Sequence, residues 1–398
     1  MRGSDLMAPR AAQWAIPLSV SLGVPIALYF SFILLGAFPF FQRHFLYAHR
    51  LNTLFWHDLN KPEYWGFARN QVTPFSLTTV DGEEIYAWHI LPLPTYLKHE
   101  DELQAQEPGF ADNITGTTSF RLLKDDPRAR LVIYFHGNAG HIAQGFRPDS
   151  YHTLTDSSQY HVLTIDYRGF GKSTGTPTEA GLIYDGAAAV DWAMHVAGIP
   201  ASRIVVLGQS LGTAVASGVA EHFAMQGVQF AGVILVAGFS NLPALLSSYA
   251  AAGFIPVLSP LRSIPPALRF FQSFIVDKWK SADRLAHLVS LTQARLRLTL
   301  IHARNDPEIP CRESDELFKS AASATIDRDI DDEGFSSWKE QRTLHREDGT
   351  FVAIVHAEPD ILIREELVPY GGHNDIMMSS AVPLAVMRSF GLDANQPS

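Results

Sequence analysis

The sequence predicts an α/β fold with a mainly parallel central sheet and helices on both faces. Short apolar runs typical of buried strands alternate along the chain with longer helical patterns, notably over 178–196. Such alternation favours parallel strands joined by crossover helices. A second observation is the pentapeptide Gly-Gln-Ser-Leu-Gly at 208–212, which stands between a predicted strand and a predicted helix. We place the strands at 130–136, 161–166, 203–208, 231–237, 297–302 and about 360–367, after a hairpin over 74–92 that turns at Asp81-Gly82.

The pentapeptide marks the first candidate for chemistry. A G-x-S-x-G turn between a strand and a helix is typical of a nucleophile elbow, in which small neighbours let a serine hydroxyl project from a tight turn. Ser210 is therefore the candidate nucleophile. The backbone N–H of Leu211, at the start of the helix, points into the same space. By itself the pentapeptide also fits a glycine-rich turn with no catalytic role.

A nucleophilic serine needs a base, and the base needs a carboxylate that orients it. In this type of fold the order along the chain is Ser, then Asp or Glu, then His. Asp306 follows the predicted strand 297–302 and so lies at the same sheet edge as Ser210, although an aspartate there could instead cap the next helix. His373 follows two glycines after the last predicted strand, and it is the candidate base among sixteen histidines.

The predicted strand 130–136 ends in a glycine-flanked loop, His-Gly-Asn-Ala-Gly at 136–140. Such a loop can present a backbone N–H, that of Asn138, to a developing oxyanion beside the N–H of Leu211. A phosphate-binding loop is the competing interpretation, but the sequence has neither G-x-x-x-x-G-K-[ST] nor G-x-G-x-x-G. No metal or cofactor motif is present, so we expect no cofactor and no metal.

Taken in order, five motifs resemble the α/β-hydrolase superfamily over about residues 73 to 390. They are His-Gly-Asn-Ala-Gly at 136–140, Asp-Tyr-Arg-Gly-Phe-Gly-Lys-Ser at 166–173, the pentapeptide at 208–212, the segment from His302 to Asp306 with Ile309-Pro310, and Gly-Gly-His at 371–373.

More narrowly, the chain resembles the abhydrolase-domain-12 group of membrane-anchored monoacylglycerol and lysophospholipid lipases. The resemblance implies Ser210 as nucleophile, Asp306 as orienting acid and His373 as base, with oxyanion donors at Asn138 and Leu211. It also implies a cytosolic N-terminus and a lumenal catalytic domain, as for a protein of the endoplasmic reticulum membrane.

The N-terminus is unlike the rest of the chain, because residues 11–42 contain no charged side chain. We predict a tail at 1–13, a single transmembrane helix at 14–42, a membrane-proximal linker at 43–72 and a hydrolase domain at 73–398. A cleaved signal peptide is the main alternative, with a shorter apolar region, and a buried soluble helix is another. Flanking charges do not orient the segment, since two arginines precede it and two follow.

Two further segments belong to the hydrolase domain. We predict a helical cap at 240–295, since residues 242–276 carry only two charges, several aromatic residues and five prolines. An apolar cap can line a slot for an acyl chain, or its apolar residues can serve only to bury the cap. Residues 323–358 form an acidic insertion, which we predict to be a mobile surface loop.

Composition narrows the classes of function. A net charge of −10 argues against a nucleic-acid partner, and the single cysteine, Cys311, excludes an internal disulfide. The expectation is a single-pass membrane serine hydrolase that acts on a lipid ester, either a monoacylglycerol or a lysophospholipid. A thioesterase, a peptidase, and a membrane-anchored binding protein without activity are the alternatives, and the oligomeric state is left open.

Overall fold

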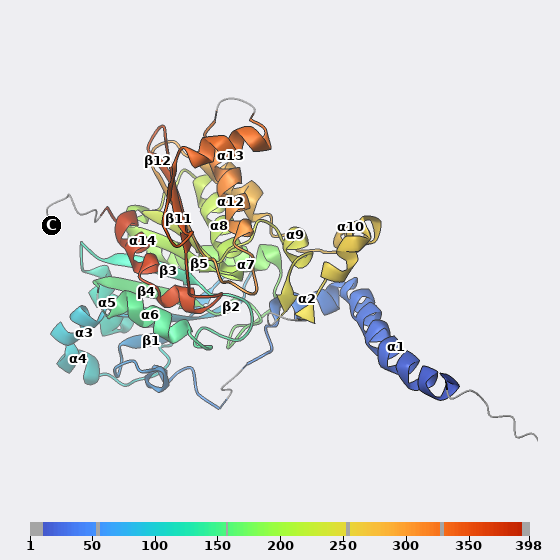
Figure 1. Cartoon of the computed structure of the whole chain (residues 1–398). Helices are drawn as coiled ribbons and strands as arrows, with labels where there is room; N and C mark the ends of the chain where they lie inside the picture. The colour runs from blue at the N-terminus through green and yellow to red at the C-terminus, as the bar shows by residue number, and fades with distance from the viewer. Residues whose placement is uncertain (1–10, 53–55, 157, 252–254, 327–329, 392–398) are drawn as a thin grey trace, which may run out of the picture.

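The computed structural model describes residues 11–52, 56–156, 158–251, 255–326 and 330–391. A twisted ten-stranded sheet forms its centre, with the strand order β1-β2-β4-β3-β5-β6-β9-β12-β11-β10 (Figure 1). The six central strands, from β4 to β12, run parallel, while β1, β2, β10 and β11 add antiparallel edges. The strands are β1 (Val72–Thr78), β2 (Glu84–Ile90), β3 (Arg130–Phe135), β4 (Tyr160–Ile165), β5 (Ile204–Gln209), β6 (Gly232–Val236), β9 (Leu296–Ala303), β10 (Thr343–His345), β11 (Phe351–Ala357) and β12 (Ile361–Val368).

Helices cover both faces of the sheet, as predicted. Strand β3 shows the division, because Leu131 and Ile133 belong to one apolar core while Val132 and Tyr134 belong to the other. This alternation follows from the two-residue period of a strand. The first face packs against α7 (Glu179–Asp191), α8 (Leu211–Ala224), α11 (Ser281–Leu291) and α12 (Arg312–Ser323), and the second against α6 (Arg147–Thr155) and α14 (Ala381–Ser389).

Shorter helices connect these layers. They are η1 (Pro62–Trp65), α3 (Leu93–Lys98), α4 (Glu100–Gln104), η2 (Ile114–Gly116), α5 (Thr118–Lys124), η3 (Trp192–Val196), η4 (Ala201–Arg203) and η6 (Asp375–Met378).

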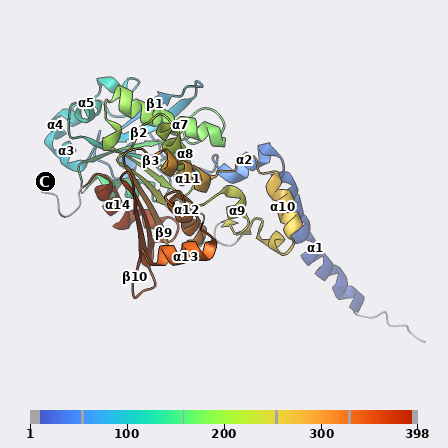
Figure 2. The same cartoon turned by 90° about the horizontal axis from the view of Figure 1, so that it is seen from above.

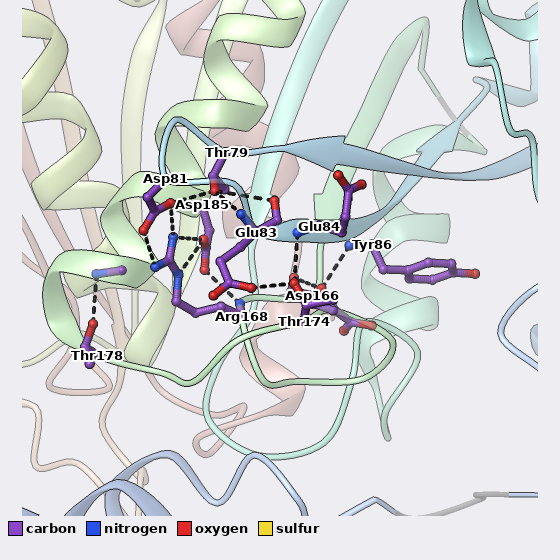
Figure 3. Close-up of polar contacts among 12 residues, drawn as sticks. Thr79, Asp81, Glu83, Glu84, Tyr86, Asp166, Arg168, Thr174, Thr178 and Asp185 are labelled. Atoms are coloured by element: carbon purple, nitrogen blue, oxygen red, sulfur yellow. Dashed lines mark hydrogen bonds and ion pairs between the residues drawn. The ribbon is translucent and has the colours of Figure 1, made fainter.

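One arginine fastens the β1–β2 hairpin to the body of the domain (Figure 3). The two terminal nitrogens of Arg168 bond the carboxylate of Asp81, in the hairpin turn, at 2.7 and 2.9 Å. The Nε of Arg168 bonds Oδ1 of Asp185, on α7, at 2.9 Å. Burial raises the pKa of Asp185 to about 7, although Arg168 acts against that rise. The segment 166–173 thus has a structural role in joining hairpin and helix.

The N-terminal segment forms two helices where a single helix was predicted at 14–42. It forms α1 (Ala11–Gly36) and α2 (Pro39–Tyr47), and we call this bent pair the elbow. Of the described residues, Gly23–Gly36 and Pro39–Tyr47 satisfy the length and hydropathy expected of a membrane span only together, bent by 106°, and no single helix satisfies them. Pro39 explains the break, since a proline has no N–H to donate to the preceding turn and favours the first position of a new helix.

The predicted cap at 240–295 is too long. After β6 the chain forms α9 (Leu242–Leu246), the two-residue strands β7 (Ala250–Ala251) and β8 (Ile255–Pro256), η5 (Ser259–Ser263) and α10 (Pro265–Ser273). Helix α11 follows, and its buried Leu285 and Leu288 join the core on the face of α8. Helix α11 is therefore part of the helical layer, and only the segment before it forms the cap, beside the elbow (Figure 2). We use the name cap for residues 242–276 from here on.

The acidic insertion at 323–358 is not a loop throughout, and the prediction is wrong for the part from residue 332. Helix α13 (Asp332–Glu340) is followed by β10 and β11, which continue the sheet beyond β12. Lys339 on α13 bonds Asp315 of α12 at 2.7 Å and Glu365 of β12 at 2.6 Å. Asp331 caps α13 by accepting the amide of Gly334. The acidic residues therefore serve in part to cap and anchor a folded element.

Candidate active site

The G-x-S-x-G pentapeptide forms the turn between β5 and α8, as its pattern indicates. Ser210 has φ 52° and ψ −119°, a region that costs a residue with a side chain on the order of 1–3 kcal/mol. A Cβ on Gly208 would lie 2.2 Å from the carbonyl oxygen of Gly212, and one on Gly212 would lie 2.0 Å from that of Phe135. Both glycines are required by this close packing, which holds the strained serine in place.

The fold brings the three predicted side chains together. The Nε2 of His373 lies 2.9 Å from Oγ of Ser210, and its Nδ1 lies 2.8 Å from Oδ2 of Asp306. Ser210 and His373 are only 9% and 8% exposed, so both residues are nearly buried. Serine, imidazole and carboxylate form one hydrogen-bonded row, a geometry that suits proton transfer from the hydroxyl to the ring.

The backbone contacts of Asp306 explain why its carboxylate faces His373 rather than the start of a helix. Its Oδ1 accepts the amides of Glu308 and Ile309 at 2.8 and 2.9 Å, while α12 begins only at Arg312. The helix-cap alternative for Asp306 is therefore wrong. Burial alone would raise the pKa of this carboxyl, but hydrogen bonds from His302 and His373 outweigh it and hold the pKa below its ordinary value. Asp306 is thus an anion at neutral pH.

The loop that carries His373 is fastened to both neighbouring parts of the site. Gly371 and Gly372 have φ values of 130° and 53°, which glycine adopts without strain. The amide of Gly372 donates to Oδ1 of Asn305 at 2.9 Å. The side chain of Gln209, next to Ser210, donates to the carbonyl of His373 at 3.1 Å. The imidazole is therefore fixed from the serine side and from the aspartate side.

Two buried charged side chains fix the backbone of the loop after β3, which carries Asn138. Arg147 is buried and donates to the carbonyls of Gly137 and Asn138 at 2.9 and 2.7 Å, and also to that of His141. Oδ1 of Asp166 accepts the amide of Ile142 at 2.6 Å. These contacts fix the backbone beside Ser210. Leu211 is the first residue of α8, so its N–H belongs to the first turn, where amides have no intrahelical partner.

Three residues that support this site were given no role from the sequence: Gln209 and His302, although both stand inside the motifs, and Arg147. His302 lies 3.3 Å from Oδ2 of Asp306 and also contacts the carbonyl of Ile309. None of the three stands at a spacing that indicates its role, because each acts through a backbone or a carboxylate that only the fold brings near. Within the described ranges, no group of three or more His, Cys, Asp or Glu side chains is arranged to hold a metal ion.

The chain resembles known proteins in sequence and in fold. The chain is 27% identical over 311 residues to lysophosphatidylserine lipase ABHD12 of Mus musculus, a match that covers 78% of this chain and 70% of that protein. It is 26% identical over 310 residues, with the same coverage, to lysophosphatidylserine lipase ABHD12 of Macaca fascicularis. The crystal structure of an alpha-beta hydrolase from Vibrio vulnificus superposes with a TM-score of 0.53 at 14% identity, covering 88% of this chain and 90% of that one.

The family model of the alpha/beta hydrolase family matches residues 132–385, a range that contains all five predicted site residues. The match confirms the predicted fold class and superfamily. This chain belongs to the alpha/beta hydrolase family.

Proposed function

We propose that this chain is a membrane-attached serine hydrolase that cleaves the ester of a single-chain lipid, a lysophospholipid or a monoacylglycerol. The observation that carries the proposal is the hydrogen-bonded row from Ser210 through His373 to Asp306. The substrate class draws support from the named activity of the ABHD12 relatives, which are lysophosphatidylserine lipases. The apolar elbow beside the cap supports contact with a membrane.

In this mechanism His373 Nε2 takes the proton of Ser210 as the hydroxyl oxygen attacks the ester carbonyl. Asp306, accepting from Nδ1, stabilises the imidazolium that forms. The negative charge on the former carbonyl oxygen is held by the N–H groups of Asn138 and Leu211. The tetrahedral intermediate then collapses, and the leaving alcohol takes its proton from His373. Water, activated by the same ring, releases the fatty acid and restores the serine.

The test is labelling by a fluorophosphonate probe together with a hydrolysis screen over lysophospholipids, monoacylglycerols and thioesters. The whole chain should be labelled at Ser210 and should hydrolyse one of the two lipid esters. Ser210→Ala should abolish labelling and reduce turnover by a factor of about 10⁴ to 10⁶. Labelling that persists in Ser210→Ala would remove the assignment. A preference for thioesters or peptides would favour the alternative enzymes, and no turnover would favour a binding protein.

We also propose that the catalytic domain faces the lumen of the endoplasmic reticulum. Support comes from the triplet Asn113-Ile114-Thr115, which is an acceptor sequence for N-glycosylation. Asn113 is exposed in the loop before η2, so a transferase can reach it. Expression in cells should give a form sensitive to an endoglycosidase that Asn113→Gln lacks. An unglycosylated wild-type chain that is protected from added protease in sealed vesicles would contradict glycosylation while keeping the lumenal orientation; digestion would contradict both.

A further inference from the structure

The elbow and the cap enclose a hollow that the catalytic residues do not use. Helices α1 and α2 supply one wall, with Phe32, Ile33 and Phe45, and the cap supplies the other, including Leu246 and Phe271. The hollow is small, about 70 Å³. A chain longer than a few methylene groups would therefore continue from it over the outer surface of the elbow and the cap.

Among the described residues that line the hollow, one side chain, Gln42, is strongly polar, and both ends of its amide are engaged. Its Nε2 donates to the carbonyl of Phe274 at 2.7 Å, and its Oε1 accepts the amide of Val276 at 3.0 Å. The glutamine thus serves to fasten α2 to the cap. The rest of the lining of the hollow is hydrocarbon. A polar group placed there would lose its hydrogen bonds to water without replacement.

The walls of the hollow are bonded to the site. Tyr47, the last residue of α2, accepts the amide of Ala139 at its carbonyl, at 3.1 Å, next to the proposed oxyanion donor Asn138. Its hydroxyl donates to Asp277, just beyond the cap, at 2.7 Å. The position of α2 is therefore fixed relative to the loop that would hold the reacting carbonyl.

The cap also reaches from the hollow toward the site. The amide of Tyr249 donates to Leu245 on α9, the helix that carries Leu246 into the hollow. Burial, as the larger cause, and the carboxylates of Glu308 and Asp306, which lie within electrostatic range of the Tyr249 phenol, together raise its pKa to about 12. The segment from Leu245 to Tyr249 therefore runs from the hollow toward the loop of Asp306.

The outer surface around the hollow is apolar. Phe38 and Phe40 of the elbow are 54% and 65% exposed, and Phe270 of the cap is 58% exposed. Helix α10 lies against the bend of the elbow in both views (Figures 1 and 2). Exposed aromatic groups on two neighbouring elements favour contact with lipid rather than water.

From these observations we infer that the hollow between elbow and cap receives the hydrocarbon chain of a lipid ester while the ester lies at Ser210. The inference rests on the proposed function and adds to it a site for the acyl chain. The N-terminal helices, in this arrangement, form part of the substrate site as well as a membrane attachment.

The test uses a substitution that narrows the hollow and leaves Ser210, His373 and Asp306 unchanged. Gly36, at the end of α1, lines the hollow, and a Cβ on it would meet no atom within 4 Å, so Gly36→Phe adds a ring at the wall of the hollow. Gly23 lies on the same helix with equally open surroundings, so Gly23→Phe is the matched control. The whole chain in detergent micelles is assayed for kcat/KM with p-nitrophenyl acetate and p-nitrophenyl palmitate.

Gly36→Phe should lower the palmitate-to-acetate ratio of kcat/KM about ten-fold or more, since lost apolar contacts discriminate chains by that order. Gly23→Phe should leave the ratio unchanged. A wild-type ratio in Gly36→Phe would overturn the inference while the proposed function stood. A wild-type chain that cleaves neither ester would instead count against the proposed function, and the inference would fall with it.

Should Gly36→Phe lose both activities, Phe271→Ala decides by enlarging the hollow from the opposite wall. A change in the palmitate-to-acetate ratio of three-fold or more supports the inference, and an unchanged ratio overturns it.

Discussion

The two regions that would meet a substrate are built in opposite ways. At the sheet edge, Ser210, Asp306 and His373 are nearly buried and joined by hydrogen bonds of 2.8 to 2.9 Å. At the elbow and cap, Phe38, Phe40 and Phe270 are more than half exposed, and a few hydrogen bonds join elements that otherwise pack through apolar surface. Directional bonds fix where atoms stand, whereas apolar packing fixes mainly how much surface is covered.

The difference shows in which region the positions of individual atoms must be precise. The chemistry proposed at Ser210 depends on positions held to a fraction of an ångström, and the glycines and buried polar groups around it hold them. A hydrocarbon chain has no directional partner, so a surface that admits one tolerates looser packing. Substitutions at the sheet edge should therefore change turnover, and substitutions at the elbow should change which substrate is admitted and how stably the parts are joined.

The largest expected effect on turnover comes from replacing Asp306, the carboxylate that bonds His373. Asp306→Asn should lower kcat on the order of 10⁴-fold, because the amide no longer orients and stabilises the imidazolium. Glu308→Gln is the matched control, since Glu308 lies 3.9 Å from Nε2 of His373 and is partly exposed. Steady-state kinetics with a soluble ester measures both. Equal losses in the two variants would mean that the carboxylate of Asp306 is not the one that acts.

The next effect concerns the loop that carries Asn138. Arg147→Met removes a buried cation that bonds three carbonyls, and we expect a loss of about 3–5 kcal/mol in the free energy of unfolding. The variant that still folds at low temperature should lose kcat about 10- to 100-fold with little change in KM, as for a displaced oxyanion donor.

Arg147→Lys is the conservative comparison, because it keeps the charge and can reach at least one carbonyl. It should recover part of both the unfolding free energy and kcat. A kcat that recovers no further than in Arg147→Met, while stability returns, would show that the guanidinium does not position the loop.

The third prediction concerns the dependence of stability on pH. Burial raises the pKa of Asp166 from the ordinary range of an aspartate to about 7, with the amide of Ile142 and the charge of Arg147 acting in the opposite direction. Between about pH 4 and 7 the unfolded chain loses this proton while the folded chain keeps it, so Asp166 makes stability fall as pH rises. Above pH 7 both states are ionised and the fall ends.

Asp166→Asn should remove this contribution, which is on the order of 2–4 kcal/mol between pH 4 and pH 8. Denaturant unfolding at both pH values measures it, with the exposed Asp101→Asn as control. A wild-type change of stability with pH in Asp166→Asn would show that Asp166 is ionised throughout in the folded state.

The smallest effect is at the joint between elbow and domain. Tyr47→Phe removes the hydroxyl bond to Asp277 and keeps the carbonyl bond to Ala139, so we expect a loss of about 1 kcal/mol in unfolding free energy. Turnover of a soluble ester should change less than about three-fold. Tyr370→Phe, at a tyrosine that is 74% exposed, is the control in thermal unfolding. A larger loss of turnover would mean that the elbow takes part in placing the loop of Asn138.

Local pattern predicted most of the sheet and singled out the serine, aspartate and histidine that the fold brings together, because strand periodicity and a glycine-flanked serine leave a signature over a few residues. It did less well where an element depends on distant partners. The acidic insertion has the composition of a loop, yet Lys339 finds Asp315 and Glu365 and folds it. Helix α11 follows an apolar segment without a clear boundary, and only its packing on α8 separates it from the cap.

By itself, the sequence determined the α/β alternation, the family and which serine, aspartate and histidine are available, since each follows from residues close together in the chain. The tertiary structure alone decided that Asp306 faces His373 rather than a helix, that Arg147 holds the loop of Asn138, and that the apolar N-terminus bends and lies on the cap. The physical reason is the distance along the chain over which each kind of interaction acts. Backbone conformation responds to neighbours along the chain, whereas hydrogen bonds and apolar contacts form between whichever groups the folded chain brings within a few ångströms.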